Sequence, residues 1–287
     1  MMSNDYNIET IINLLSQNNY TFGEGELTSQ EIKQIKKQSK DSRGIYGVNA
    51  PIETNIFSFI SQNDDIVFQL HEFKDSALDA MIIKYSPQSE RKYIVINSDK
   101  PLINQVFAAA HEFYHYKYSF AGNTRNSFIC SFNENIKEEI KANRFAAEFL
   151  LPEEALKTEL EAFLRFHENF EESPIHKQIA FCLTLVIKYA LPLKAVLYRL
   201  KEEHITSTDF LFSHYEDVKR ILIGLSEDFP LVKNLYSKSN KYIKEPLYDL
   251  VPLLYNKGRL DDSTVNTIIK KFDLSESQIK EELINNE

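Results

Sequence analysis

The sequence predicts an α+β protein that is mostly helical, with a small antiparallel sheet packed on one helix and an additional helical region at the C-terminus. Strand-like runs rich in Val, Ile, Tyr and Phe are confined to one stretch of the 287-residue chain. Apolar residues recur at helical spacing on both sides of that stretch. These patterns divide the chain into an N-terminal helical segment (residues 1–60), a main domain (61–207) and a C-terminal helical region (208–287).

Two short helices are predicted in the N-terminal segment, over residues 8–20 and 28–39, with two glycines between them. Thr28 or Ser29 can cap the second helix, and Glu31 lies in its first turn. The N-terminal segment is therefore expected to add helices, and no strands, to the fold.

The main domain is expected to begin with three strands, over residues 65–73, 77–86 and 91–98, joined by polar turns. The next helix has Ser98 or Asp99 as its cap and runs through Tyr118. Further helices are predicted over residues 134–150, 153–167, 174–190 and 192–203, followed by four or five short helices between 210 and 287.

Charge and composition exclude several classes of protein. The chain has 33 basic and 42 acidic side chains, and its net charge of -9 disfavours direct binding to nucleic acid. The longest apolar run, residues 179–191, is too short to span a bilayer and contains a lysine. The first 20 residues lack the pattern of a signal peptide. We therefore expect a cytoplasmic protein that does not associate with membranes.

The stretch "AAAHEFYHYKY", residues 108–118, contains an HExxH motif. Positions four apart on an α-helix lie within about 40° of each other, so His111 and His115 share one face. Two imidazoles in that position can bind one Zn²⁺ while Glu112 acts as general base toward water. The alternative is a buried helix that contains histidines by coincidence, and the motif therefore needs support from elsewhere in the chain.

A zinc site of this kind needs a third protein ligand, which a neighbouring helix can supply. The segment "EEIKANRFAAEFLLP", residues 138–152, offers Glu139 as that ligand, with Glu138 as the alternative. Asn143 falls on the same face as Glu139 and can orient a ligand histidine by a hydrogen bond. The same ligand set also accepts Mn²⁺, Fe²⁺ or Co²⁺, and zinc is the metal that we expect.

The chain resembles the ImmA/IrrE family of zinc metallopeptidases over about residues 60–206. Three elements agree in order and spacing: "YIVIN" (93–97), "QVFAAAHEFYH" (105–115) and "EIKANRFAAEFLLP" (139–152). The later "LPLKAVLYRLKEEHIT" (191–206) looks like the helix that follows in that family. The resemblance implies a gluzincin-like fold with His111 and His115 as zinc ligands, Glu112 as base and Glu139 as third ligand. Asn143 falls on the asparagine of the family.

The resemblance also implies a substrate, because family members with known roles cleave helix-turn-helix transcriptional repressors and thereby relieve repression. Other members lie beside such regulators in pairs that resemble toxin-antitoxin systems. The chain departs from the family at Tyr114, where a small residue is usual, and at Leu151, where methionine is common. A ring at position 114 can narrow the cleft or provide a hydroxyl to it.

Stabilising the developing oxyanion requires the metal and a second donor, for which Tyr114 and Tyr116 are candidates. Their alternative role is aromatic packing. The function expected is hydrolysis of a peptide bond in a repressor protein by a zinc metalloendopeptidase. The alternative is a zinc-binding protein, latent or without catalytic activity, that binds a regulator without cutting it. The helices beyond residue 207 can pack on the main domain or dock a partner.

Overall fold

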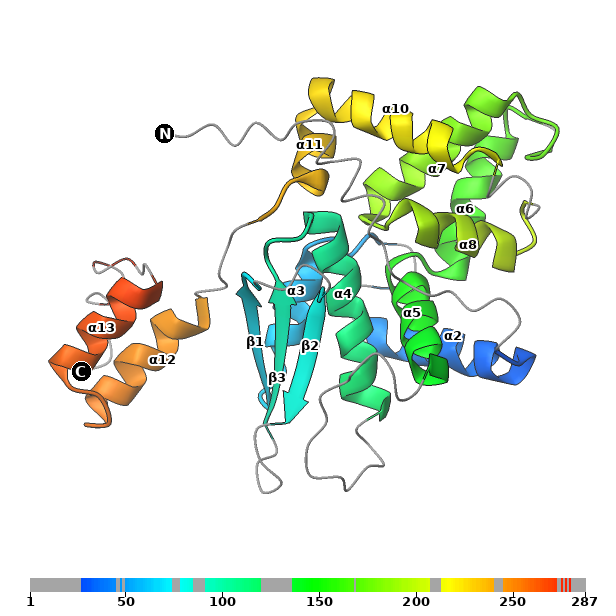
Figure 1. The fold of residues 1–287 in the computed structure, drawn as a ribbon. Helices are drawn as coiled ribbons and strands as arrows, with labels where there is room; N and C mark the ends of the chain where they lie inside the picture. The colour runs from blue at the N-terminus through cyan, green and yellow to red at the C-terminus, as the bar shows by residue number, and fades with distance from the viewer. Residues whose placement is uncertain are drawn as a thin grey trace.

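The computed structural model of the chain describes the residues 27–44, 47, 50–73, 78–84, 91–119, 136–167, 169–206, 213–239, 245–272, 275, 277 and 279. The helix predicted over residues 8–20 lies outside this set. The chain folds into many helices around one three-stranded sheet (Figure 1), so the predicted α+β, mostly helical class is confirmed.

The first described helix is α2, Ser29–Arg43, and Thr28 caps it as the sequence predicts. The Thr28 hydroxyl oxygen accepts from the Glu31 backbone N–H, and the Glu31 carboxylate accepts from the Thr28 N–H at 2.9 Å. This reciprocal pair satisfies backbone donors that a helix start otherwise leaves free. Helix α3, Asn55–Ser61, follows and buries three apolar side chains.

The sheet comprises β1 (Ile66–His71), β2 (Ala80–Lys84) and β3 (Lys92–Asn97), in the order β1-β3-β2. Strand β3 pairs antiparallel with β2 but parallel with β1. The prediction of an antiparallel sheet is therefore wrong for β1. Strand β3 lies between the two earlier strands, where a simple meander would have placed β2.

The side chain of Asn97 explains how the chain crosses the end of β3. Its amide oxygen accepts from the Phe73 backbone N–H at 3.1 Å, just after β1. Its amide N–H₂ donates to the Leu78 carbonyl at 2.9 Å, just before β2. One buried residue at the end of the central strand thus holds both ends of the β1–β2 connection.

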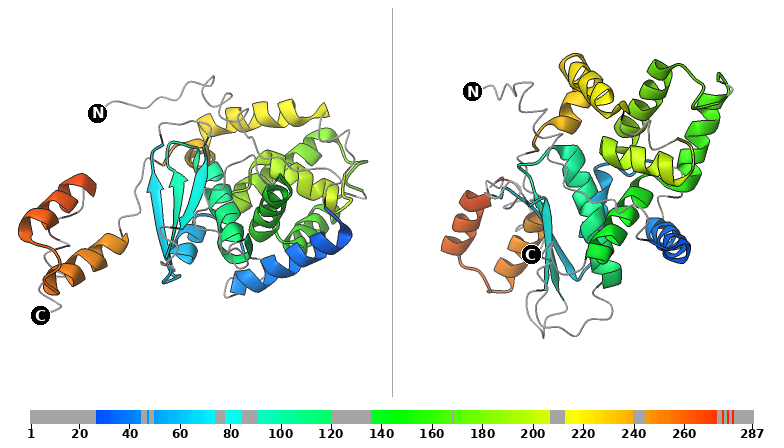
Figure 2. Two further views of the ribbon diagram at one scale, coloured as in Figure 1. Left: turned by 60° about the horizontal axis from the view of Figure 1, so that its bottom comes forward. Right: turned by 45° about the vertical axis from the view of Figure 1, so that its right-hand side comes forward.

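Helix α4, Leu102–Tyr114, lies along one face of the sheet (Figure 2), and its residues from Ile103 to Tyr114 are buried. A π-helical turn, η2 (His115–Ser119), continues it, so the single helix predicted through Tyr118 changes type at residue 115. The expected cap at Ser98 or Asp99 is also wrong, because Pro101 is the N-cap residue.

The start of α4 is completed by a distant part of the chain. The Leu102 backbone N–H donates to the Ser237 carbonyl at 2.9 Å. The Ser239 hydroxyl donates to the Gln105 side-chain carbonyl at 2.9 Å, and Lys238 forms an ion pair with Asp99. A helix start leaves its first N–H groups without partners in the helix. The segment 237–239 therefore acts as a cap for α4.

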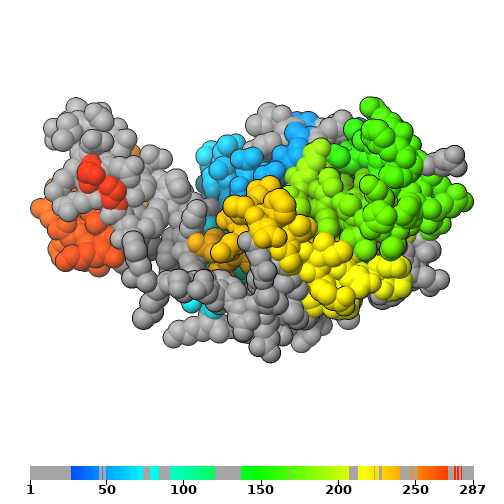
Figure 3. Space-filling view, turned by 90° about the horizontal axis from the view of Figure 1, so that it is seen from above, coloured from blue at the N-terminus to red at the C-terminus, as the bar shows by residue number. Residues whose placement is uncertain are grey.

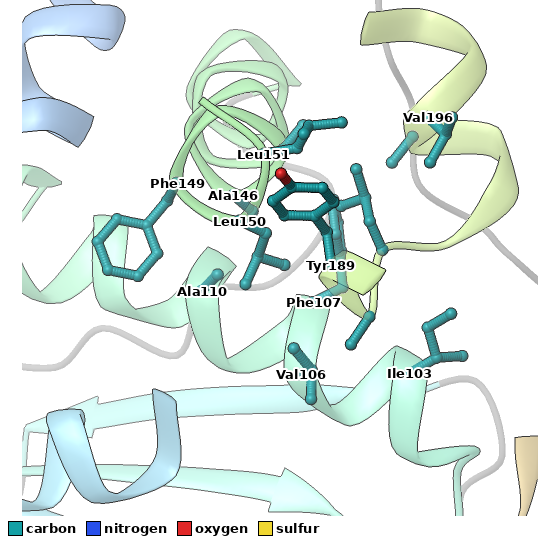
Figure 4. Packing of buried hydrophobic residues seen from close by; sticks show 14 of the residues in the cluster. Ile103, Val106, Phe107, Ala110, Ala146, Phe149, Leu150, Leu151, Tyr189 and Val196 are labelled. Atoms are coloured by element: carbon teal, nitrogen blue, oxygen red, sulfur yellow. The ribbon is translucent and has the colours of Figure 1, made fainter. Parts of the chain in front are cut away.

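Helix α5, Ile136–Leu150, packs against α4 through small residues. Ala110 of α4 and Ala146 of α5 lie in this interface with the larger side chains of Phe107 and Phe149 around them (Figure 4). Alanine at such positions lets two helix backbones approach closely. Three more helices complete this part of the body: α6 (Glu153–Leu164), α7 (Ile175–Tyr189) and α8 (Leu193–Glu202).

The C-terminal region forms four helices in its described part: α10 (Tyr215–Asp228), α11 (Pro230–Tyr236), α12 (Glu245–Asn256) and α13 (Asp262–Phe272). Helices α10 and α11 bury Val218, Leu222 and Val232 in the main core, and α10 lies against α7 (Figure 3). Helices α12 and α13 have a small core of their own around Val251 and Val265.

A network of buried charges joins α5 to α8. Glu148 forms ion pairs with Arg144 at 2.8 Å and with Arg199 at 3.1 Å. Arg199, which is completely buried, also donates to the Leu151 carbonyl at 3.2 Å. Burial by itself raises the pKa of Glu148, but the two guanidinium groups outweigh it and hold this pKa below its usual range.

No single helix in the described ranges is long and apolar enough to cross a bilayer. Helices α7 and α8 reach that length and composition only as a pair, bent by 113° at the break between them.

Candidate metal centre

Helix α4, the turn η2 that continues it and helix α5 bring together the three residues that the sequence singles out as metal ligands. His111 Nε2 lies 3.1 Å from His115 Nε2. The Glu139 carboxylate lies 3.1 Å from His111 Nε2 and 3.4 Å from His115 Nε2. Both histidines are buried and Glu139 is partly buried. Three potential ligand atoms from two helices therefore converge on one point.

The spacing of these atoms fits a tetrahedral zinc ion. Metal–ligand distances of about 2.0–2.1 Å place neighbouring ligands about 3.3 Å apart, close to the three distances observed. The amide oxygen of Asn143 lies 2.8 Å from His111 Nδ1. It can accept only from a protonated Nδ1, and in a neutral ring this leaves the Nε2 lone pair for a metal ion.

Electrostatics in the cluster favour a bound cation. Burial by itself lowers the pKa of His111, but its hydrogen bond to Glu139 and the charges of Glu112 and Glu139 outweigh this and raise it. Burial raises the pKa of Glu139, but the hydrogen bonds and charges of the two histidines reverse the effect and lower it strongly. The site thus holds an ionised carboxylate and stabilises positive charge beside it.

Glu112 lies beside the candidate ligands, and one of its carboxylate oxygens accepts no hydrogen bond from the described residues. Its Oε2 atom is buried and has no hydrogen-bond partner among the residues that the structure describes. Burial, reinforced by the charge of Glu139, raises the pKa of this carboxyl above its usual value despite the two neighbouring histidines. A free oxygen and a raised pKa suit a group that takes up and returns a proton.

Helix geometry explains the placement of these residues. His111 lies on α4, and His115 is the first residue of η2, which continues this helix; side chains four apart lie on one face, so both histidines point toward α5. The alanines of α5 let it lie close to α4, so that Glu139 and Asn143 both reach the histidines. The placement of Glu112, His111 and His115 follows from the sequence motif and the helix that carries it.

The candidate oxyanion donors have other partners. The Tyr114 hydroxyl donates to Glu138 at 3.3 Å, and the Tyr116 hydroxyl donates to Asp65 at 2.6 Å. Neither of the two hydroxyls is bonded to a residue of the cluster in the described part of the chain. Glu138, the alternative third ligand, pairs with Lys141 at 2.7 Å and is absent from the ligand group.

One residue of the site was missed in the sequence. The Ser119 hydroxyl oxygen lies 3.0 Å from His115 Nδ1, in the position that the Asn143 oxygen occupies on His111. The sequence feature that could have revealed this contact is the spacing of four residues, about one helical turn, between His115 and Ser119. Because the helix was predicted to end at Tyr118, Ser119 was not considered part of it.

Fold and site together resemble those of a metallopeptidase: an HExxH helix packs on a small sheet, and a glutamate from the next helix lies beside its histidines. Residues 63–201 match the family model Peptidase_M78, the IrrE N-terminal-like domain, so this part of the chain is similar to a family of peptidases. This match confirms the resemblance to ImmA/IrrE. No curated protein matches the chain.

The family match ends within α8 and begins just before β1. Helices α2, α3, α10 and α11 lie outside it, although each of them buries residues in the same core as the matched domain. The structural body is therefore larger than the family domain.

The Asn143 amide is expected to matter for metal binding. Replacing Asn143 with alanine removes the acceptor that holds His111 Nδ1 and is expected to raise the zinc dissociation constant about 10- to 100-fold. Competition with a chromophoric chelator measures this constant. Asn63→Ala is the matched control, since Asn63 donates only to backbone carbonyls at the end of α3. Equal zinc affinity in the Asn143 and Asn63 variants would contradict the role of Asn143.

Proposed function

We propose that the chain is a zinc-dependent metalloendopeptidase that hydrolyses a peptide bond in a protein substrate. The observation that carries this proposal is the combination of two facing histidine nitrogens, a carboxylate within 3.4 Å of both and a neighbouring glutamate with a free oxygen. A purely structural cluster has no need of the free Glu112 oxygen, because a buried carboxylate atom without a partner destabilises the fold.

In this function His111, His115 and Glu139 hold the metal. A bound zinc ion supplies the Lewis acid that acidifies water and polarises a carbonyl group. Glu112 takes a proton as water attacks the scissile carbonyl, and it later gives that proton to the leaving amine. Asn143 keeps the His111 ring oriented throughout.

The proposed substrate is a helix-turn-helix transcriptional repressor in the cytoplasm, and its cleavage would relieve repression. The support for this substrate is the resemblance to the ImmA/IrrE family. The net charge of -9 fits recognition of a protein rather than of the operator DNA itself. A zinc-binding regulator that binds a repressor without cutting it is the competing function, and the free oxygen of Glu112 favours catalysis over it.

Metal content tests the proposal. Purified wild-type protein is expected to hold about one zinc ion per chain. Glu139→Gln and His115→Ala are each expected to lose it, because each removes one of three protein ligands. Inductively coupled plasma mass spectrometry after dialysis gives the stoichiometry. A wild-type protein that takes up no zinc from an excess would refute the proposed function.

A further inference from the structure

The HExxH helix changes its geometry at the second histidine. Residues 102–114 are α-helical, and residues 115–119 form the π-helical turn η2. A π-helix has i→i+5 hydrogen bonds and more residues per turn than the 3.6 of an α-helix. The rotation from His115 to Ser119 is therefore less than one full turn about the helix axis. Four residues of an α-helix would instead rotate about 40° beyond a full turn. Such turns occur mostly as local insertions in α-helices, frequently at functional sites.

The turn places a hydroxyl group beneath the ring of His115. Helical side chains lean toward the N-terminus of their helix, so the Ser119 side chain points back over the preceding turn. Its oxygen lies 3.0 Å from His115 Nδ1. The other nitrogen of this ring, Nε2, lies 3.1 Å from His111 Nε2 and 3.4 Å from Glu139. When Nδ1 of the neutral ring donates to this hydroxyl oxygen, Nε2 keeps its lone pair for the cluster.

Two tyrosines fix the turn to opposite sides of the body. The Tyr116 hydroxyl donates to Asp65 at 2.6 Å, directly before β1, and Lys92 of β3 lies 4.8 Å above the Tyr116 ring. The Tyr118 hydroxyl donates to the Gln38 carbonyl of α2 at 3.1 Å and lies 2.8 Å from the Ser42 hydroxyl.

These contacts anchor η2 to the sheet on one side and to α2 on the other. The residue between the two tyrosines, Lys117, lies 5.0 Å above the Phe113 ring. A turn held to two separate elements by its tyrosines has little freedom to unwind. The position of the Ser119 hydroxyl is therefore set by the body of the protein and not by the local chain alone.

From this geometry we infer that Ser119 is a positioning residue that fixes the ring orientation and the tautomer of His115, and that the anchored π-helical turn exists to place it. Ser119 contacts Nδ1 of His115 as Asn143 contacts Nδ1 of His111, with its hydroxyl oxygen as the acceptor in the assigned tautomer. The inference rests on the proposed metal site. It also goes beyond that site, because it assigns a role to η2 and to the tyrosines that hold it.

The test compares Ser119→Ala with Ser119→Thr, which keeps a hydroxyl at the same position. Ser61→Ala is the matched control, because the Ser61 hydroxyl also bonds to a group four residues earlier, the Phe57 carbonyl, but lies on α3. Long-range ¹H–¹⁵N NMR on metal-free protein reads the tautomer of His115. Chelator competition on the same variants gives the zinc dissociation constant.

Wild type, Ser119→Thr and Ser61→Ala are expected to show His115 protonated at Nδ1 and to share one zinc affinity. Ser119→Ala is expected to show a mixture of tautomers and a dissociation constant raised about tenfold. An unchanged tautomer with unchanged affinity in Ser119→Ala would overturn the assignment. A wild-type protein that binds no zinc would refute the metal site, and the NMR measurement, which needs no metal, would still decide the role of Ser119.

Discussion

Replacing Glu112 with glutamine is expected to reduce peptide hydrolysis about 10²- to 10⁴-fold while the protein keeps its metal. Glutamine has nearly the shape of glutamate but cannot accept a proton from the attacking water. The three groups that converge on the metal position, His111, His115 and Glu139, are untouched by this change. The loss is therefore expected in the rate constant of the chemical step and not in metal binding.

The measurement uses purified helix-turn-helix repressors from the same genome, with products separated by gel electrophoresis and the cut identified by mass spectrometry. Zinc content of the variant is measured in parallel. A Glu112→Gln protein that holds zinc and still cuts at the wild-type rate would show that another group is the base. A wild type that holds zinc and binds a repressor without cutting it would instead support the role of a regulator.

Replacing Arg199 with methionine is expected to lower the free energy of unfolding by about 3 kcal/mol. The Arg199 side chain is completely buried and contacts the carboxylate of Glu148, itself 2% exposed, and the Leu151 carbonyl. Methionine fills much of the volume but leaves a buried carboxylate with Arg144 as its remaining close cation. Urea unfolding followed by circular dichroism measures the change.

The effect of this substitution is expected to depend on pH. The pKa of Glu148 is lower in the folded chain than its value of about 4.3 in the unfolded chain. A depressed carboxyl pKa contributes stability above the unfolded pKa, and this contribution is lost as the pH falls through the folded pKa. The difference in the free energy of unfolding between wild type and Arg199→Met should therefore be largest at neutral pH and should decrease below about pH 4.

Arg220→Met provides the control for the arginine substitution. Arg220 also pairs with a carboxylate, that of Asp217, but its side chain is 77% exposed. Exposed pairs contribute little, so this variant is expected to unfold within about 0.5 kcal/mol of wild type at every pH. Equal stabilities of the two arginine variants would mean that the buried network does not stabilise the fold.

The helices and the motif on them could be predicted from the sequence because both depend on local spacing. The cap at Thr28 depends on residues three positions apart, and the shared face of His111 and His115 on residues four apart. The pairing of Glu139 with these histidines is a contact between helices. Its prediction depended on the requirement of the metal for a third ligand and on the alanines that let the helices approach.

The features that escaped prediction depend on contacts between distant residues. Strand order in the sheet depends on Asn97, whose amide bonds to residues 19 and 24 positions away. The change from α4 to η2 depends on Tyr116 and Tyr118, which contact residues 51 and 80 positions away. No periodicity in the sequence reports such contacts, because each strand or turn is locally compatible with several arrangements.

The cap that residues 237–239 place on α4 has a consequence for the order in which the protein matures. Ser237 lies 36 positions beyond residue 201, where the family match ends, yet its carbonyl accepts the first N–H of the helix that carries the histidines. A chain emerging from the ribosome therefore contains every candidate metal ligand long before it contains this cap. Helix α4 is complete at its N-terminal end only after nearly the whole body has been synthesised.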